Sequence, residues 1–481
     1  MIKHTNFTKL RIMIDIKKII VLILCGLIFT ESKQIYATIQ MMDQVMILDA
    51  ENLEISQSIN TDFIEDSQCP NLNNENDCVL SSSCEWMMGE CMESMLGGLD
   101  VPHFVTLDEL NGYWFITAIA SGFIAQYSLL DNTFIDSYFV GDAPALIAID
   151  PINQVIYCST VGMMFMDSMN GMMPSLESNT IQVLNYSPIG LSQSINQEYI
   201  IDSTAPHGIA INEDGTEIYT ASNTADWIYK INTQNGEILG VPMDQNVNNT
   251  PDLIMQRLKP IQCLSTGNRL FISCSAGNWI NPSTQEITVI EGKLQMWNSD
   301  SMELIDTIDL GEYSSPWHIV KSPLDQIIYV VLGGSDTYET EGLASVSYEN
   351  DNLSINWITN NSSFDTLHGV DVSADGQKIY VSGRGDGNIH IFDYNGNYIE
   401  NIFLGQMTML GGIAVEKKDL PIIGDINNDL NINISDIINL VDIVLYPTMS
   451  HPYQVYASDF NQNELINIFD IILLVENILS N

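Results

Sequence analysis

Two stretches near the C-terminus carry oxygen side chains at the spacing of a calcium-binding loop. Residues 425–436 read DINNDLNINISD and residues 459–470 read DFNQNELINIFD. Oxygen ligands fall at positions 1, 3, 5, 9 and 12, with a backbone carbonyl at position 7, as in an EF-hand loop that surrounds Ca²⁺. The predicted ligands are Asp425, Asn427, Asp429, Asn431, Asn433 and Asp436 in loop one, and Asp459, Asn461, Asn463, Leu465, Asn467 and Asp470 in loop two. We therefore expect two calcium ions per chain.

The two loops belong to one duplicated unit. The apolar segments 432–445 and 466–479 are identical at nine of fourteen positions, at an offset of 34 residues. Loop one has three carboxylates and loop two has two, so we expect loop one to bind Ca²⁺ more tightly. Position 6, usually Gly because the chain turns sharply there, is Leu430 or Glu464, which predicts backbone strain. A second interpretation is that Ca²⁺ only folds the module, since about 60 residues bury little apolar surface unaided.

A loop followed by a helix, twice, with Asp at position 12 and no helix before either loop, resembles a type I dockerin domain. The resemblance covers residues 424–481. It implies two bound Ca²⁺ ions and docking onto a cohesin-bearing scaffold or surface protein. Positions 10 and 11, which choose the cohesin in well-known members and are often Ser-Thr there, are Ile434-Ser435 and Ile468-Phe469 here. Partner specificity therefore does not carry over from the family.

Cysteines and methionines gather in two inserts. The insert 65–98 holds four cysteines, Cys69, Cys78, Cys84 and Cys91. In an exported chain they predict a disulfide-stapled segment with three alternative connectivities, and a zinc site is the competing interpretation. Cys263 and Cys274 flank a predicted hairpin and are a further candidate disulfide. Six methionines in 163–173 predict a flexible inter-strand loop, with a Cu(I) site as the alternative.

One sequence motif recurs through the middle of the chain. It reads APALIAIDPINQVIYCST at 143–160, APHGIAINEDGTEIYTAS at 205–222 and TLHGVDVSADGQKIYVSG at 366–383, with divergent copies at 101–118 and 315–332. Each copy is a strand, a turn and a second strand, and about four strands per repeat of 40–60 residues predict a mainly β fold, a β-propeller. The seven innermost strands are expected to begin near His103, Ala145, His207, Pro260, Trp317, His368 and Gly411. Residues 34–59 supply the outer strands of the last blade, so the two ends of the propeller pair and close the ring.

The segment IYAT…VMILDAENLEI and the later segments similar to it resemble the YVTN family of seven-bladed propellers over residues 34–417. The resemblance implies a surface or binding module. The predicted organisation is a signal peptide at 1–33, a propeller at 34–417 and a small α-helical dockerin-like domain at 418–481.

Three histidines share one position of the repeat, namely His103, His207 and His368, and His318 lies one residue past it. This position is near the start of the innermost strand, so the imidazoles are expected to rim one mouth of the central channel. Neutral imidazole binds copper, zinc and iron, and some propeller enzymes hold a metal there. The alternative is that each histidine makes the same structural hydrogen bond in its own blade.

Composition limits localisation and partners. Lys17-Lys18 before the apolar run 19–29 predicts a secretory signal, too short to span a bilayer, so we expect a secreted or cell-surface protein with no membrane span. The net charge is −45, from 61 acidic and 16 basic residues, and six of the basic residues lie at or before Lys33. No basic patch can form, which argues against a nucleic-acid partner.

Two functional hypotheses follow. The first is a non-catalytic binding or display protein whose propeller recognises a polysaccharide or a surface protein and whose C-terminal domain docks it to a cohesin. The second is a secreted propeller enzyme, a polysaccharide-active hydrolase or lyase or a lactonase, tethered in the same way. The motifs GxSxG, GxxxxGK[ST] and HExxH are absent from the sequence. We therefore assign no catalytic residue.

Overall fold

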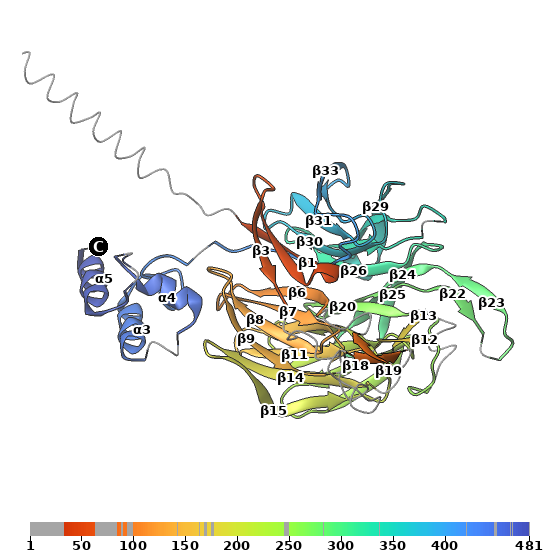
Figure 1. Ribbon diagram of the computed structural model, residues 1–481, viewed down its shortest axis with the longest axis horizontal. Coiled ribbons are helices and arrows are strands. Elements are labelled where there is room, and N and C mark those ends of the chain that lie inside the picture. The colour runs from red at the N-terminus through yellow and green to blue at the C-terminus, as the bar shows by residue number, and fades with distance from the viewer. Residues whose placement is uncertain are drawn as a thin grey trace, which may run out of the picture.

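The computed structural model describes residues 33–62, 84–87, 90–93, 100–141, 143–162, 164–167, 171–174, 178–244, 250–281, 283–335, 337–419, 421–446, 450–461, 463 and 465–480. These residues form seven four-stranded antiparallel sheets, three two-stranded hairpins and a C-terminal group of helices (Figure 1). The sheets are the blades of a β-propeller, so the predicted mainly β, seven-bladed fold is confirmed.

The blades follow one another along the chain. Blade 1 holds β1 (Gln34–Ile39), β2 (Gln44–Asp49), β3 (Ile55–Asn60) and β34 (Leu410–Val415). Blade 2 holds β6 (Pro102–Asp108), β7 (Tyr113–Ala118), β8 (Phe123–Ser128) and β9 (Phe134–Phe139). Blade 3 holds β10 (Pro144–Asp150), β11 (Val155–Thr160), β14 (Thr180–Ser187) and β15 (Gly190–Ile200). Blade 4 holds β16 (Pro206–Ile211), β17 (Glu217–Ser222), β18 (Trp227–Asn232) and β19 (Ile238–Pro242).

The remaining blades have the same order. Blade 5 holds β20 (Pro260–Thr266), β21 (Arg269–Cys274), β24 (Gly292–Asn298) and β25 (Leu304–Gly311). Blade 6 holds β26 (Pro316–Lys321), β27 (Ile327–Leu332), β28 (Gly342–Ser347) and β29 (Ser354–Asn360). Blade 7 holds β30 (Leu367–Val372), β31 (Lys378–Gly383), β32 (Asn388–Asp393) and β33 (Tyr398–Phe403). The hairpins are β4 (Cys84–Met87) with β5 (Glu90–Glu93), β12 (Met164–Asp167) with β13 (Gly171–Pro174), and β22 (Gly277–Ile280) with β23 (Ile287–Ile290).

The ring closes by pairing the first described strand with the last. β1 lies antiparallel to β34 in the order β3-β2-β1-β34, so blade 1 combines both ends of the propeller, as the sequence predicted. The pairing completes the seventh four-stranded blade from the two ends of the propeller, so blade 1 has the same number of strands as the other six. The buried aliphatic side chains between successive blades form the core.

Glu416, just past β34, adds a pH-dependent contribution to this closure. Its carboxylate accepts hydrogen bonds from Gln34 N at 3.0 Å and from the Tyr36 hydroxyl at 3.1 Å. Burial nevertheless raises the pKa of Glu416 to about 7 from its ordinary value of 4.5. Because the folded pKa is the higher one, this stabilisation is complete below pH 4.5 and is lost as the pH rises through 7.

We therefore expect the free energy of unfolding to depend less on pH in Glu416→Gln. Between pH 5 and pH 8 the free energy of unfolding should fall by about 2 kcal/mol less in the variant than in the unmodified protein. This value allows for partial screening of the Glu416 charge by solvent. Chemical denaturation at the two pH values measures this difference. Glu400→Gln, on the exposed strand β33, is the matched control. An unchanged pH slope in Glu416→Gln would contradict the assignment.

The same backbone conformation precedes each of the seven innermost strands. A non-glycine residue with φ between 46° and 53° precedes it, and its carbonyl accepts a hydrogen bond from the N–H group one or two residues past the neighbouring strand. A β-bulge then follows at the second or third residue of the strand. The left-handed residues are Val101, Ala143, Ala205, Lys259, Ser315, Thr366 and Met409. The bulges carry the side chains that the sequence aligned, including His103, His207 and His368.

The two faces of the propeller differ. We call the face on which the innermost strands begin the histidine face, and the opposite one the turn face. All three extra hairpins lie in connections that leave from the histidine face, because each joins either the second to the third strand of a blade or one blade to the next. The innermost strands end on the turn face, where the connections within the described residues are short turns.

The C-terminal module contains α3 (Ile434–Leu445), α4 (Pro452–Ser458) and α5 (Ile468–Ser480). Leu440 and Leu474, equivalent in the duplication, are both fully buried at the centre of its small core. The expectation that no helix precedes either loop is wrong for loop two, because α4 ends immediately before Asp459. Pro452 starts this helix well, since proline is tolerated in the first turn and fixes a helical φ.

The module rests on the turn face, at the left of Figure 1. His451 reaches the propeller with both ring nitrogens. Nδ1 lies 3.0 Å from the Tyr113 hydroxyl and Nε2 lies 2.7 Å from the Gln154 amide. Tyr453 joins the buried cluster that contains Trp114. Where the described residues are concerned, no helix has both the length and the apolar character needed to cross a membrane.

Several cysteine and methionine predictions have a clear outcome. Cys263 and Cys274 are buried free thiols rather than a disulfide, because they are out of register: Cys263 pairs with Ile272, and Cys274 with Pro260. Cys158 is buried in β11, as expected. The methionine-rich segment lies in the connection between β11 and β14, as predicted, and within that connection β12 pairs antiparallel with β13.

Other predictions fall outside the described residues. They are the signal peptide, Cys69 and Cys78, and the side chains of Cys84, Cys91 and the six methionines. The domain boundary at 417/418 stays a prediction.

Candidate functional site

Loop one brings its first and twelfth residues together. The Asp436 carboxylate accepts hydrogen bonds from Ile426 N at 2.9 Å and Asn433 N at 2.8 Å, so it lies beside the residue that follows Asp425. Asp425 in turn accepts from Asp429 N at 3.0 Å and Leu430 N at 2.8 Å. Leu430 has a φ of 67°, which confirms the strain predicted at position 6 and costs roughly 1–2 kcal/mol for a residue with a Cβ atom.

Loop two repeats much of this geometry. The Asp470 carboxylate accepts from Asn461 N at 3.3 Å and Asn467 N at 2.9 Å, and Asp459 accepts from Asn463 N at 3.0 Å. The Oδ1 atom of Asn461, at loop position 3, is buried and has no hydrogen-bond partner among the described residues. Glu464, at position 6, lies outside the described residues. The 34-residue duplication is therefore visible in the backbone as well as in the sequence.

Position 9 has a structural role in both loops. The side chain of Asn433 accepts from Ser435 N at 2.8 Å and caps α3, with Asp436 completing a capping box. Asn467 accepts from Phe469 N at 2.9 Å at the start of α5. Such caps typically stabilise a helix by about 1 kcal/mol. Part of the repeated pattern is thus accounted for by helix initiation.

The donor set nevertheless fits a hard cation. Asp425, Asp436 and Asp470 are each no more than 1% exposed, and no ion pair within the described part of the chain involves any of them. Buried carboxylates are stable when they are paired or when they coordinate a metal. The unpartnered Asn461 Oδ1 is a further oxygen of the type that Ca²⁺ binds.

One predicted ligand of loop one, Asp429, is engaged in hydrogen bonds within the loop. Asp429 accepts from the side chain of Asn427 at 2.9 Å and from Asn431 N at 2.8 Å. Within the described residues, no three His, Cys, Asp or Glu side chains form a metal-binding group. A cation in this loop would therefore depend on a side-chain rotation of Asp429 and on the Asn and carbonyl oxygens.

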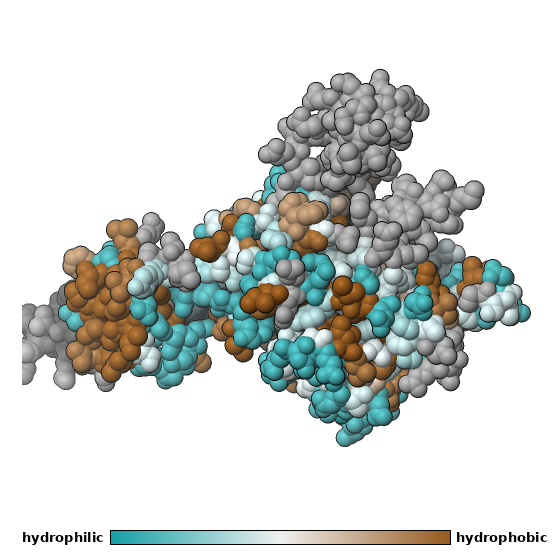
Figure 2. Space-filling view, turned by 90° about the horizontal axis from the view of Figure 1, so that it is seen from below, coloured by the Kyte–Doolittle hydropathy of each residue, from teal (hydrophilic) through white to brown (hydrophobic). Residues whose placement is uncertain are grey.

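The outer surface of the module is apolar (Figure 2). Exposed aliphatic and aromatic side chains recur at the 34-residue offset along α3 and α5. They are Ile434, Ile438 and Leu445 on α3 and Ile468, Phe469, Ile472 and Leu479 on α5. We call this set the helical face. Contiguous exposed apolar surface of this kind often marks a protein interaction site.

The central channel gathers the histidines of four different blades on the histidine face. The ring centroids of His103 and His368 lie 5.3 Å apart, those of His103 and His207 lie 6.2 Å apart, and those of His318 and His368 lie 4.7 Å apart. The blades that carry these residues are not all neighbours, so the narrowness of the channel brings the rings together. His318, one residue past the repeat position, belongs to the same cluster.

The histidines do not share one structural hydrogen bond. His103 Nδ1 lies 2.7 Å from the Gln40 amide nitrogen, and His207 Nδ1 donates to the Ile261 carbonyl at 2.6 Å. Neither ring nitrogen of His368 has a hydrogen-bond partner within the described residues, and the Nε2 atoms of His103 and His318 also lack one. The repeated hydrogen bond expected under the structural alternative is therefore not present.

Hydroxyl groups make the repeated contact instead. In five blades a Ser or Thr on the second strand donates to a carbonyl of the next innermost strand; these residues are Thr38, Thr117, Ser159, Ser273 and Ser382. Blade 4 has Ala221 at this position, and there the imidazole of His207 supplies the missing donor to the next blade. His207 is thus partly explained by structure, whereas His103, His318 and His368 are not.

The cluster consists of neutral imidazoles. Burial is the largest cause that lowers the pKa of His103, His207 and His368 below the ordinary value. It also lowers the pKa of His318, to about 3. Nearby imidazoles and the positive charge of Arg384 lower the pKa of His103, His318 and His368 further. A neutral imidazole offers one N–H donor and one lone pair.

No family model matches the chain, and no curated protein matches it. Solved structures do match. A putative 6-phosphogluconolactonase from Bacteroides uniformis is 11% identical, with a TM-score of 0.53, over 80% of this chain and 100% of that one. Kuenenia stuttgartiensis hydrazine synthase is 13% identical, with a TM-score of 0.50, over 67% and 91%.

A catalytically inactive virginiamycin B lyase from Staphylococcus aureus, solved with quinupristin, is 15% identical, with a TM-score of 0.47, over 66% and 92%. The fold is that of a seven-bladed propeller. At 11% and 13% identity, the likeness to the putative lactonase and to hydrazine synthase shows the fold alone and transfers no activity.

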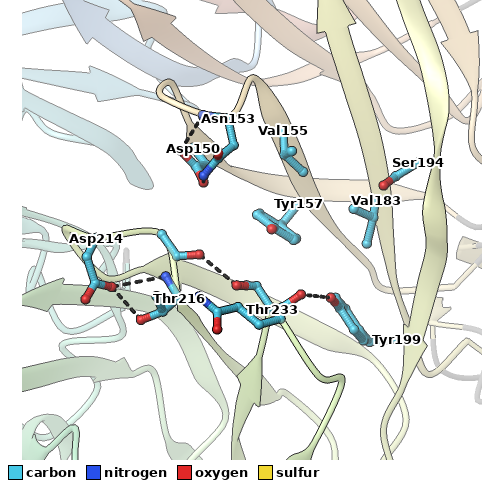
Figure 3. A pocket seen from close by; sticks show the side chains of 12 residues that line it. Asp150, Asn153, Val155, Tyr157, Val183, Ser194, Tyr199, Asp214, Thr216 and Thr233 are labelled. Atoms are coloured by element: carbon cyan, nitrogen blue, oxygen red, sulfur yellow. Dashed lines mark hydrogen bonds between the residues drawn. The ribbon is translucent and has the colours of Figure 1, made fainter.

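A groove between blades 3 and 4 is a further hollow, of about 300 Å³ (Figure 3). Its polar side chains serve the hairpin turns around it. Asp150 accepts from the side chain of Asn153 at 2.7 Å, Asp214 accepts from the hydroxyl and the N–H group of Thr216, and Tyr199 donates to the Thr233 carbonyl at 3.3 Å. Because these groups are already engaged, we assign no ligand to this groove.

The sequence pattern missed Arg384 as a member of the channel mouth. Arg384 follows β31, and its N–H group donates to the Thr366 carbonyl at 3.0 Å, on the histidine face. One signal was available. Only ten of the chain's 16 Lys and Arg residues lie after Lys33, and this one directly follows a copy of the repeat that contains His368.

Proposed function

We propose that this protein is an exported display module in which a β-propeller is anchored by a calcium-dependent, dockerin-like C-terminal module to a cohesin-bearing partner. One observation carries the proposal. Three carboxylates at loop positions 1 and 12, those of Asp425, Asp436 and Asp470, are buried without a basic partner among the described residues. A divalent cation would supply the missing positive charge at the positions where calcium loops carry their ligands.

The helical face supports the docking part of the proposal. Phe469 is 65% exposed and Ile434 is 68% exposed, and both lie at the loop positions that select the partner in type I dockerins. Large exposed apolar side chains are unfavourable in water and become favourable when a partner covers them. Ca²⁺ would hold α3 and α5 in the arrangement that presents this face.

A binding experiment with purified components tests the proposal. We expect the full chain to bind at least one member of a panel of cohesin domains in Ca²⁺, and to lose that binding in a chelator. Phe469→Asp should abolish the interaction without changing calcium stoichiometry, because this side chain is exposed and holds no ligand. Ile422→Asp, on an exposed residue ahead of loop one, is the matched control and should bind normally.

Calorimetry completes the test. Two Ca²⁺ ions should bind per chain, with the tighter site in loop one. A chelator-stripped protein that binds no Ca²⁺ would exclude the metal interpretation, and calcium binding without any cohesin partner would exclude the docking interpretation alone. The catalytic alternative, a tethered hydrolase, lyase or lactonase, stays a hypothesis because no described side chain has an assigned chemical step.

A further inference from the structure

The histidine face carries a second candidate site, which does not depend on the calcium loops. We propose that Arg384 and the histidine cluster bind an oxyanion, that is, a carboxylate, sulfate or phosphate group of a small molecule or a glycan, at the mouth of the propeller channel. The site would give the propeller its ligand, which the C-terminal module does not specify.

The position of Arg384 in its blade directs it towards the mouth. The equivalent residue of blade 1 is Gln40, since the N–H groups of Gln40 and Arg384 bond to the carbonyls of the equivalent residues Met409 and Thr366. The Gln40 amide reaches His103 in the next blade, at 2.7 Å. The positive charge of Arg384 lowers the pKa of His103, His318 and His368, three of the four histidines in the cluster.

Arg384 has no acidic partner within the described part of the chain. None of the ion pairs there involves it, although 61 of the 481 residues are Asp or Glu. The nearest acids along the chain are engaged elsewhere. Asp386 lies 2.9 Å from His390 Nε2, and Asp365 accepts from the Thr366 hydroxyl at 2.8 Å. A partly buried guanidinium without a counter-ion is costly, which points to an anionic ligand.

The imidazoles complete the donor set. When the Gln40 amide donates to His103 Nδ1, the ring proton is on Nε2, an atom that is buried and has no hydrogen-bond partner in the described part of the chain. His318 and His368 contribute further unpartnered ring nitrogens. Trp317 stacks near His368, with centroids 4.7 Å apart, and Phe104 lies 5.7 Å from His318. These aromatic walls exclude water and so strengthen a charged hydrogen bond.

A cation is the less favourable occupant. Imidazoles alone would suit a transition metal, but here the ion would lie near a guanidinium that no carboxylate neutralises. The same charge favours an oxyanion, for which the planar guanidinium supplies paired donors. Access is through the mouth, because Arg384 and His207 are the partly exposed members of the site while His103, His318 and His368 are buried.

Titration of the full chain with three probes tests the site. Sodium phosphate, sodium sulfate and sodium galacturonate are added at constant ionic strength and followed by calorimetry and by the melting temperature, with neutral galactose as the comparison. We expect saturable binding of at least one oxyanion and at least a tenfold weaker affinity in Arg384→Gln. Arg269→Gln removes the same charge from an ion pair between Arg269 of blade 5 and Asp351 of blade 6, and this variant should bind like the unmodified protein.

A readout without ligand separates recognition from a structural role. Because the guanidinium lacks a counter-ion, Arg384→Gln should raise the melting temperature of the ligand-free protein, whereas removal of a structural arginine would lower it. The proposal would be overturned by equal affinities in Arg384→Gln and the unmodified protein, by no saturable binding of any oxyanion, or by saturable binding of Zn²⁺, titrated separately, in place of an oxyanion. Galactose binding of equal strength would also overturn it.

Discussion

The combined substitution Asp425→Ala and Asp436→Ala is expected to unfold the C-terminal module. Both side chains are buried, and together they anchor five backbone N–H groups of loop one and its capping box. If loop one binds Ca²⁺ as proposed, their removal eliminates its first and last ligands, so the stabilisation that the ion would confer by mass action, about 2.7 kcal/mol at one hundred times the dissociation constant, is lost there. Since α3 packs against α5 in one small core, loop two should be weakened as well.

Calcium calorimetry and heteronuclear NMR of the full chain measure this result. The stoichiometry should fall from two ions to one or none, and the amide signals of 424–481 should collapse to the narrow range of an unfolded segment. Asp442→Ala, on the exposed side of α3, is the matched control and should retain both ions. The melting transition of the propeller should stay nearly unchanged, and loss of both transitions together would contradict separate folding of the two parts.

The substitution Trp114→Ala is expected to cause the largest loss of propeller stability. Trp114 is fully buried, stacks on Tyr127 at a centroid distance of 4.0 Å, and lies 5.3 Å from Tyr36 in blade 1. It therefore fills the interface between blade 2 and the blade that closes the ring. Truncation of a buried aromatic residue costs about 3–5 kcal/mol, from lost apolar burial and from the cavity left behind.

Denaturant unfolding monitored by far-ultraviolet circular dichroism gives the measurement. Trp357→Ala is the matched control, because Trp357 lies on the outer strand β29 and is only partly buried. The free energy of unfolding should fall much less in Trp357→Ala than in Trp114→Ala. A smaller loss in Trp114→Ala than in Trp357→Ala would show that the interface beside the ring closure tolerates a cavity.

The sequence predicted the propeller well because its repeat is made of local signals. Alternating apolar strands and Asp- or Gly-containing turns are readable in each copy, and the pairing of β1 with β34 follows once seven innermost strands are counted. Helix α4 was missed because seven residues of mixed polarity show no periodicity of their own. The register that separates Cys263 from Cys274 is set at the hairpin turn, where Thr266 pairs with Arg269 and Cys263 therefore pairs with Ile272, and the sequence did not fix which residues flank that turn.

The two candidate sites also differ in how far the sequence alone could locate them. The two candidate calcium loops are contiguous in the sequence, so their oxygen-bearing side chains could be located from spacing alone. The histidine cluster depends on the diameter of a channel that brings four distant blades together. Arg384 enters it through the backbone equivalence with Gln40, a relation that exists only in three dimensions.

The arrangement of the two faces has a mechanical consequence. The C-terminal module contacts the turn face, whereas the imidazoles lie at the opposite mouth of the channel and all three extra hairpins belong to connections on that side. A protein held by its tail in this way would turn its open pore outward, towards the surrounding medium. Capture of a solute and attachment to a support would then be sterically independent, so many such discs could be arrayed side by side with every pore accessible.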